Sequence, residues 1–200
     1  MNLNVNSILI VGLGMIGSSI ALSSKLKGIK VYGLDVKKSI SERALNRGII
    51  DQVIESIDQI NSSESSNEVD LIIITVPPKQ TLDVIKELEM LWNTSVTITD
   101  TSSVKNHIDV ENVSNIVLSH PIAGSDRSGM DAADINLFTN KKNVICNPFN
   151  ADKEHLERVE NFWKNALQMR TVFMPVSEHD LVFAMTSHLP HLISYALIDS

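Results

Sequence analysis

The stretch ILIVGLGMIGSSI, Ile8–Ile20, decides the fold, because an apolar run enters a glycine-rich turn and a helix pattern follows it. Ser7 to Val11 is a continuous apolar run of the kind found in buried parallel strands. Met15 to Leu26 has the pattern of a helix that ends before a glycine. The glycines between them are spaced G-x-G-x-x-G, which is typical of a turn that brings a phosphate to a helix N-terminus. We therefore expect an α/β fold whose first turn binds a phosphate-containing ligand.

Each glycine of this turn has a separate task. Gly12 allows the tight bend, Gly14 lets the backbone approach a diphosphate, and Gly17 allows the helix to pack closely on the strand. Asp35 ends the second predicted strand, Lys30 to Leu34, about 20 residues further on. A carboxylate there accepts hydrogen bonds from the ribose hydroxyls and repels a 2′-phosphate, which predicts NAD rather than NADP. The alternative is that the glycines only shape a turn and the aspartate caps the next helix.

Strand and helix patterns alternate along the following residues. A parallel sheet with helices on both faces, a Rossmann-type doubly wound α/β fold, is the architecture that this alternation predicts. The further strand candidates are Val69–Val76, Ser95–Thr99, Asn115–Ser119, Asn143–Cys146 and Thr171–Met174. The further helix candidates are Ser39–Arg47, Lys79–Trp92 and Lys153–Leu167.

The chain changes character near its end. The polar stretch Asn61 to Glu68 is expected to be a solvated loop, whereas from Val176 to Ser200 the pattern is helical and apolar. We therefore predict an NAD-binding domain over residues 1–174 and the start of a helical substrate and dimerisation domain over residues 175–200. Most of that second domain is expected to be lacking, or another chain covers the apolar face.

Composition narrows the choice of partners and compartment. Hydrophobic residues make up 43% of the 200 residues, and the net charge is −7, which disfavours nucleic acid and anionic membranes as partners. The one cysteine, Cys146, follows apolar residues and is expected to be buried, so a reducing cytoplasm fits. MNLNVNS at the N-terminus lacks the features of a signal peptide, and no apolar stretch approaches the ~20 residues that span a bilayer.

A histidine in the stretch SHPIAGSDRSG, Ser119–Gly129, is the candidate catalytic base. His120 follows a predicted strand, and Pro121 would fix a rigid turn that aims the imidazole into the cofactor crevice. An enzyme that removes hydride from a carbinol-type carbon needs a group to take the proton, and histidine is suited to that. Ser103 could orient the ring by a hydrogen bond. The alternatives are a structural histidine and a serine that caps a helix.

The stretch SEHDLVFAMTSHLPH, Ser177–His191, adds a second polar cluster. Ser187, His188 and His191 are spaced to share a helical face, where Pro190 should kink the helix. The cluster could form a substrate-binding wall, a structural kink or a metal site. Because no matching set of carboxylates or cysteines accompanies it, we expect no metal. The pair His179-Asp180 is expected to support the structure, or to support a site residue from behind, rather than to catalyse.

The carboxyl ends of parallel strands line the ligand crevice in such folds. TVPP after the fourth predicted strand and DTSSVK after the next are therefore expected at that edge, although the two prolines could simply stop a strand. Together with the glycine turn they give the predicted cofactor contacts, which are Gly12, Gly14, Met15, Ile16, Gly17, Asp35, Val76, Pro77 and Ser102.

Taken in order, VGLGMIGSSIA, the strand-end aspartate, TVPP, DTSSVK, SHPIAGSDRSG and EHD…TSHLPH resemble prephenate dehydrogenase and its arogenate-using relatives over essentially the whole chain. The resemblance implies the NAD-dependent oxidative decarboxylation of prephenate to 4-hydroxyphenylpyruvate, a step of tyrosine biosynthesis. It makes His120 the catalytic histidine and Ser103 its partner.

The resemblance further places Ser187, His188 and His191 on the substrate side. Asp126 stands where family members often have glutamate. It also implies a homodimer, formed by a C-terminal helical domain that supplies a substrate-binding arginine. No residue of this chain can be assigned to that arginine.

Three alternatives stay open at this point. The first is an arogenate dehydrogenase that yields tyrosine directly. The second is a hydroxyacid dehydrogenase of the 3-hydroxyisobutyrate type, which shares the glycine turn but relies on a lysine in a later helical domain. The third is a non-catalytic NAD-binding module.

Overall fold

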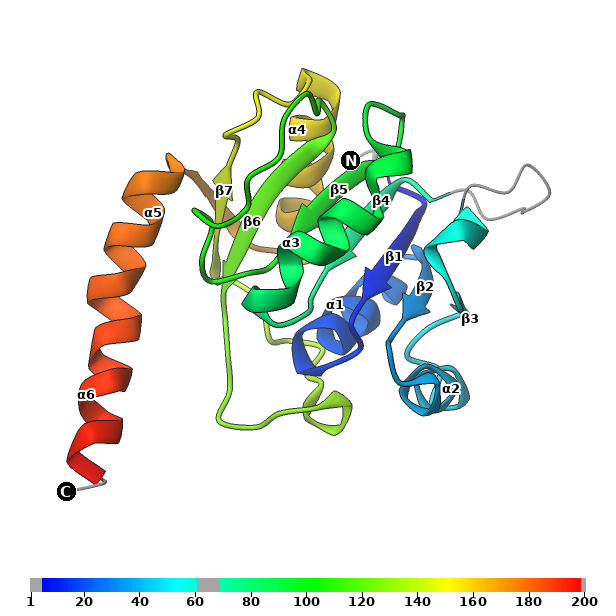
Figure 1. Ribbon diagram of the computed structural model, residues 1–200. Coiled ribbons are helices and arrows are strands. Elements are labelled where there is room, and N and C mark those ends of the chain that lie inside the picture. Colours follow the sequence, from blue (N-terminus) through cyan, green and yellow to red (C-terminus); the bar gives the residue numbers. More distant parts are fainter. Residues whose placement is uncertain (1–4, 61–68, 199–200) are drawn as a thin grey trace.

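One sheet organises the fold, and its strand order is β3-β2-β1-β4-β5-β6-β7-β8. The structure is a computed structural model that describes residues 5–60 and 69–198 (Figure 1). Its strands are β1 Ser7–Val11, β2 Lys30–Leu34, β3 Gln52–Val53, β4 Leu71–Ile74, β5 Thr97–Asp100, β6 Ile116–Ile122, β7 Lys142–Cys146 and β8 Arg170–Phe173. All neighbours pair in parallel except β6 and β7, which are antiparallel. The predicted doubly wound, mainly parallel sheet is confirmed.

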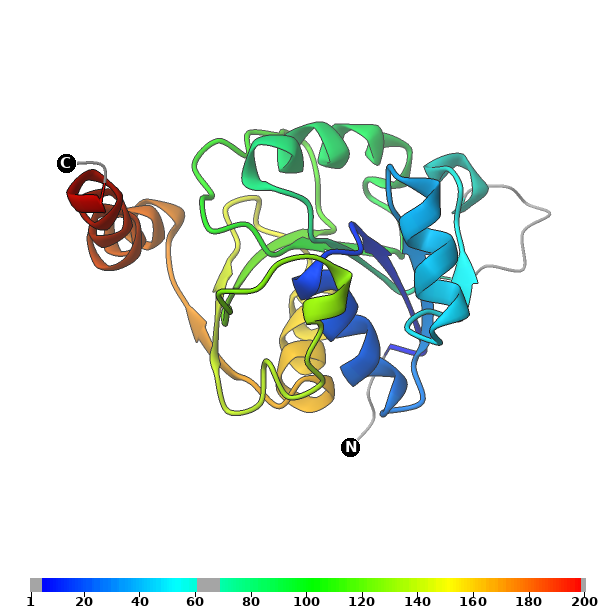
Figure 2. The same ribbon diagram turned by 90° about the horizontal axis from the view of Figure 1, so that it is seen from below.

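Helices cover both faces of this sheet (Figure 2). The covering helices are α1 Met15–Lys25, α2 Lys38–Asn46, α3 Pro78–Glu87 and α4 Lys153–Asn161, and after β8 the chain continues into α5 Val176–Phe183 and α6 Leu189–Ile198. Short 3-10 turns are η1 Ile57–Ile60, η2 Glu89–Leu91 and η3 Met130–Ala132, and π-helical turns are η4 Phe162–Ala166 and η5 Ala184–His188. No helix in residues 5–60 and 69–198 is long and apolar enough to cross a membrane.

Alternating side chains of the central strands fill two separate cores. On β1, Ile8 and Ile10 pack into the core under α1 and α4, whereas Leu9 and Val11 pack into the core under α3. All four side chains are almost completely buried. Such a strand is apolar on both faces, which is why its sequence is a continuous apolar run. The chain crosses from one face to the other between β1 and β4, and this crossing opens a crevice at the carboxyl ends of the strands.

The sequence placed His120 and Pro121 in a turn after a strand, and this prediction is wrong. Both residues lie inside β6, where they pair with Val144 and the residue before it in β7. The ladder between β5 and β6 reaches no further than Val117 of β6. Beyond that point β6 has a partner strand on one side only, so a proline without an N–H group is tolerated there. Extended backbone, not a turn, holds the imidazole.

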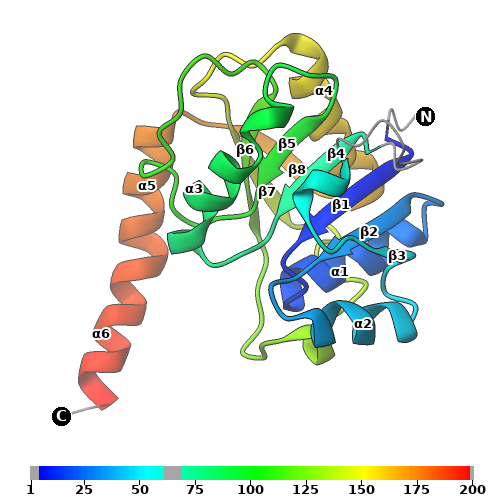
Figure 3. The ribbon, with the colours of Figure 1, turned by 45° about the vertical axis from the view of Figure 1, so that its right-hand side comes forward.

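The predicted helices differ from the observed ones mainly at their ends. The expected helix Lys79–Trp92 divides into α3 and η2, and the expected helix Lys153–Leu167 ends in the π-helical turn η4. Near the C-terminus, α5, η5 and α6 form one continuous rod that projects from the sheet domain (Figure 3). Leu189 donates its N–H to the carbonyl of Ala184, so this rod widens immediately before Pro190. The predicted polar loop, residues 61–68, lies outside the described residues.

Candidate functional site

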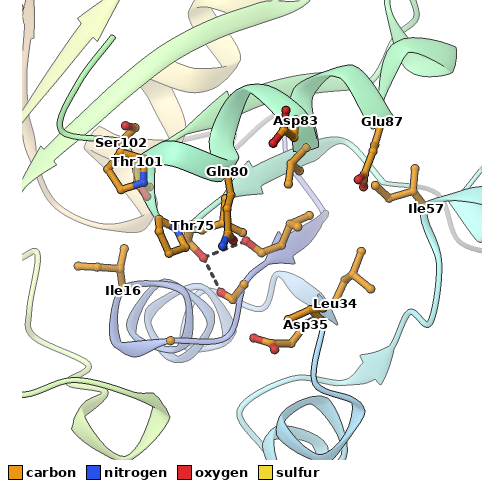
Figure 4. Close-up of a pocket in the computed structure, with 18 of the residues that line it drawn as sticks. Ile16, Leu34, Asp35, Ile57, Thr75, Gln80, Asp83, Glu87, Thr101 and Ser102 are labelled. Atoms are coloured by element: carbon orange, nitrogen blue, oxygen red, sulfur yellow. Dashed lines mark hydrogen bonds between the residues drawn. The ribbon is translucent and has the colours of Figure 1, made fainter. Parts of the chain in front are cut away.

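A cavity of about 1120 Å³ opens at the carboxyl ends of β1, β2, β4, β5 and β6 (Figure 4). The glycine turn, residues of α3 and His120 all line it. The residues that line it are Val11, Gly12, Gly14, Ile16, Leu34, Asp35, Val36, Glu55, Ser56, Ile57, Asp58, Thr75, Val76, Pro77, Pro78, Gln80, Asp83, Val84, Glu87, Thr101, Ser102, Ser103, His120, Pro121 and Ala123. One continuous space therefore joins the phosphate-binding turn to the candidate base.

The glycine turn is built as its sequence predicts. Gly12 has a φ of +98°, which favours glycine, and a Cβ at Gly17 would lie 2.1 Å from the carbonyl oxygen of Gly12. Thr75, at the end of β4, holds the turn by donating its hydroxyl to the carbonyls of Val11 and Gly12 (Figure 4). A Cβ at Gly14 would meet no atom within 4 Å, so the backbone there faces open space in the cavity.

This turn fits the diphosphate of a dinucleotide. Gly14 caps α1, and among residues 5–60 and 69–198 no side chain caps the first N–H groups of that helix. Free N–H groups and the positive end of the helix dipole favour an anion at that point. The open backbone at Gly14 lets the anion approach them closely.

A carboxylate lies at the ribose side of the turn. Asp35 accepts hydrogen bonds from the backbone N–H of Leu13 at 2.9 Å and of Lys37 at 3.0 Å. It therefore braces the glycine turn and also lines the cavity. Four further carboxylates line the same cavity, and the lining residues given above include neither lysine nor arginine. The further carboxylates are Glu55, Asp58, Asp83 and Glu87.

At the other end of the cavity, His120 is held by a second histidine. Its Nδ1 lies 2.9 Å from Nε2 of His179, which comes from α5, and the ring of Phe183 packs edge-on at 4.7 Å. Burial, together with the positive charge of Lys105 and the nearby rings of His179 and His188, lowers the pKa of His120 to about 3. The imidazole is therefore neutral at neutral pH, which is the form that accepts a proton.

His179 is buried and contacts a carboxylate on its other side. Its Nδ1 lies 2.7 Å from Oδ1 of Asp180, and burial lowers the pKa of His179 despite that neighbour. Burial alone would raise the pKa of Asp180. The bonds from His179 and from the backbone N–H groups of Asn106 and Lys105 outweigh that effect, so the pKa lies below its usual value. Asp180 is thus an anion at neutral pH.

A buried ion pair fixes the loop after β5. Lys105 is fully buried, with Nζ 2.6 Å from Oδ2 of Asp100 and 2.5 Å from the carbonyl oxygen of Ser119. Asp100 also accepts the N–H groups of Ser102 and Ser119. The DTSSVK segment is thereby tied to the residue that precedes His120. Because its charge is already paired, Lys105 is not free to hold a substrate carboxylate.

The cavity brings together most of the predicted cofactor contacts and both predicted catalytic residues. Met15 and Gly17 do not line it, because Gly17 packs inside the turn. Ser103 lines the cavity, but within the described residues His179, not Ser103, is the hydrogen-bond partner of His120 Nδ1. No helix follows Ser102 and Ser103, so neither caps one. Ser102 donates its hydroxyl to the carbonyl of Val104.

Asp126, Ser187 and His188, three of the predicted substrate residues, do not line the cavity. Asp126 is exposed and accepts a hydrogen bond from Ser125. Ser187 and His188 are half-buried in η5. His191 belongs to α6, and its side chain is outside the described part of the chain.

Sequence reasoning missed three contributions. Thr75 was not singled out, although its place directly after a buried strand and before TVPP is the signal that could have found it. Lys105 was left without a role, and His179-Asp180 was expected to support the structure or a site residue, without His120 being identified as its partner. The contact between His179 and His120 depends on how α5 packs against β6. The local sequence around either residue does not specify that packing. Cys146 is buried as expected, and burial raises the pKa of its thiol to about 11.

Comparison with known proteins gives a consistent result. The family model for the nucleotide-binding domain of prephenate dehydrogenase matches residues 20–170. Prephenate dehydrogenases of Lactococcus lactis subsp. cremoris and Bacillus subtilis are 33% and 32% identical to the chain. The matches take in 97% and 99% of the chain but 53% and 54% of those proteins. The chain therefore spans about half the length of these curated relatives.

Solved structures support the same grouping. A prephenate dehydrogenase from A. aeolicus, in complex with hydroxyphenyl propionate and NAD+, superposes with a TM-score of 0.88 at 32% identity. That match covers 100% of this chain and 70% of the other. A diketoreductase at 16% identity and a TM-score of 0.60 shares the fold alone.

Proposed function

Because the chain belongs to the prephenate dehydrogenase family, we propose that it binds NAD in the cavity and takes part in the oxidative decarboxylation of prephenate to 4-hydroxyphenylpyruvate. The observation that carries this proposal is the single cavity that joins the glycine turn to His120. A hydride acceptor bound along that turn and a neutral imidazole then meet the same substrate. In this proposal the described residues supply the dinucleotide side of the site and the base.

The chain's own residues divide the work of holding the cofactor. Gly14 and the first turn of α1 present backbone N–H groups to the diphosphate, whereas the N–H of Gly12 is bonded to the carbonyl of Leu34 and this glycine shapes the turn. Asp35 accepts hydrogen bonds from the ribose hydroxyls. Ile16, Val76, Pro77 and Ser102 line the path toward His120. Met15 and Gly17 act indirectly, by starting α1 and by packing it on β1. When bound, NAD supplies the acceptor for the hydride.

His120 supplies the proton chemistry. Its neutral imidazole accepts a hydrogen bond from the hydroxyl on the substrate ring and draws that proton as the hydride leaves the same carbon. Breaking the bond to the carboxylate releases CO2, and the bonding electron pair moves into the ring, which becomes aromatic. The ring oxygen then takes the proton back from His120, which gives the phenol of the product and restores the neutral imidazole. The gain of aromaticity drives the step, so the protein mainly positions and polarises the reactants.

Further roles follow from the resemblance of the motifs. We assign Ser103 to the catalytic end of the cavity, and Ser187, His188, His191 and Asp126 to the substrate side. We also propose that residues 1–174 form the cofactor domain and that residues 175–200 begin a helical substrate and dimerisation domain. A homodimer and a cytoplasmic location stay predictions.

The test is a turnover assay on the purified chain with NAD and either prephenate or arogenate, followed by the absorbance of NADH. We expect NADH to form, and we expect His120→Asn to abolish turnover while NAD binding, measured by calorimetry, is kept. His107→Asn, a histidine outside the cavity, is the matched control and should retain activity. NAD binding without turnover of either compound would contradict the proposal in favour of a non-catalytic module. Turnover of a simple 3-hydroxy acid instead would favour the hydroxyacid dehydrogenase.

A further inference from the structure

Three side chains form a hydrogen-bonded series that starts at His120 and ends on the backbone of the loop after β5. Nδ1 of His120 lies 2.9 Å from Nε2 of His179, and Nδ1 of His179 lies 2.7 Å from Oδ1 of Asp180. His179 is completely buried. Phe183 packs against both imidazoles at 4.7 Å, which limits their rotation. The series therefore has one well-defined geometry.

Asp180 sets the direction of every hydrogen bond in this series. Its Oδ2 accepts the backbone N–H of Asn106 at 2.8 Å, and its Oδ1 accepts that of Lys105 at 2.9 Å. An ionised carboxylate can only accept, so His179 must carry its proton on Nδ1. A neutral imidazole has one N–H group, so Nε2 of His179 is an acceptor and Nδ1 of His120 is the donor. Nε2 of His120 is then left with a free lone pair.

We propose that His179 and Asp180 are positioning residues, which hold His120 in the Nδ1–H tautomer and so keep its Nε2 lone pair available to the cavity. This inference rests on the proposed function, in which Nε2 receives the hydroxyl proton. When Nε2 takes that proton, Nδ1–H still donates to His179, and no other bond in the series has to change. The negative charge of Asp180, one ring away, stabilises the imidazolium that forms.

A purely structural role is the competing explanation, because Asp180 also ties α5 to the loop that carries Ser102 and Ser103. The substitution Asp180→Asn separates the two. The backbone N–H groups of Lys105 and Asn106 need an acceptor, so the amide oxygen must face them and the amide NH2 must face His179. His179 would then accept at Nδ1 and donate from Nε2. Nδ1 of His120 would then have to accept that bond, so the tautomer of His120 would be reversed and its proton would lie on Nε2.

The experiment is nitrogen-15 NMR of the imidazole groups in the whole chain and in Asp180→Asn, with the exposed Asp109→Asn as matched control. We expect Nδ1–H on His120 in the wild type and in the control, and Nε2–H in Asp180→Asn. Where turnover is measurable, kcat of Asp180→Asn should fall at least about tenfold while KM for NAD stays within about twofold, as expected for a lost base. Nε2–H in the wild type, or an unchanged tautomer in the variant, would overturn the inference.

Two further results keep the test decisive. If Asp180→Asn does not fold by circular dichroism, His179→Leu replaces it. That variant removes the acceptor of Nδ1–H, so His120 should populate both tautomers, and a single unchanged tautomer would overturn the inference. If the wild type gives the expected tautomers but no NADH, the proposed function fails while the positioning role stands.

Discussion

At the scale of single residues, the environment of His120 keeps its imidazole uncharged at neutral pH, because it lowers the pKa of the ring to about 3. Burial is the largest cause, and the neighbouring charge of Lys105 adds to it. The negative charge of Asp180, which bonds His179, opposes these effects only in part. A base that stays unprotonated at neutral pH is the functional consequence of this arrangement.

The low pKa of His120 makes stability depend on pH. An unfolded histidine takes up a proton below pH ~6.5, whereas the folded one stays neutral down to about 3, so acid favours unfolding in this interval. Relative to His120→Asn, the wild type should lose up to about 2 kcal/mol of unfolding free energy between pH 7.5 and pH 5. Urea unfolding at both pH values measures this difference. His107→Asn serves as control, and equal pH dependence in wild type and His120→Asn would contradict the assignment.

At the scale of elements, two glycines of the β1–α1 turn have different roles: one is needed for packing and the other for ligand binding. Gly17 faces the backbone of Gly12, and Gly14 faces the open cavity. Both are glycines of one motif, yet only one of them has a neighbour that a methyl group would strike. The two positions therefore allow a matched pair of substitutions.

Gly17→Ala should destabilise the fold by about 3 kcal/mol or more, because its Cβ would overlap the Gly12 carbonyl. Gly14→Ala should fold as well as the wild type, since its φ of −73° suits alanine. It should nevertheless bind NAD at least about tenfold more weakly, because the methyl group occupies the space of the diphosphate. Thermal unfolding and calorimetric titration measure the two effects. Tight NAD binding by Gly14→Ala would place the diphosphate elsewhere.

The central elements were predictable because their signals are local. β1 and β2 occur at the predicted residues, since apolar runs bounded by glycine or aspartate leave little choice of register. β6 was predicted to end at Ser119 and extends to Ile122, because its last residues pair with β7 from 20 or more residues further on. The proline that indicates a turn in the sequence is acceptable once that one-sided pairing exists.

The candidate site was likewise predictable only where its residues carry local sequence signals. The glycine turn, Asp35 and His120 carry recognisable local signals, and all line the cavity. The bond from His120 to His179 joins residues 59 positions apart and depends on where α5 docks. Spacing along the chain could not supply that contact.

At the scale of the whole molecule, the cavity lining is acidic, although Lys38 pairs with one of its carboxylates, Glu55, at 2.7 Å. Asp35 is joined there by Glu55, Asp58, Asp83 and Glu87. A 2′-phosphate entering this space would meet several carboxylates, whereas ribose hydroxyls can donate to them. The negative charge of the carboxylates that line the cavity therefore favours the binding of NAD over that of NADP.

This preference should appear in the stability of the folded chain. At 100 times its Kd, NAD should add about 2.7 kcal/mol and raise Tm by about 5–10 °C. The same concentration of NADP should give a clearly smaller shift, and Asp35→Ser should narrow the gap between the two. Differential scanning calorimetry measures all four values. Equal increases in Tm with the two cofactors in the wild type would contradict the idea that the carboxylates of the cavity select NAD over NADP.

The central claim is that the dinucleotide and His120 share one cavity. It is tested most directly by following the imidazole NMR signals of the chain while NAD alone is added. The account predicts a saturable shift of the His120 signals, whereas those of His155, which bonds Thr97 away from the cavity, stay unchanged. Saturable NAD binding that leaves His120 unmoved, or that moves His155 as much, would contradict the account.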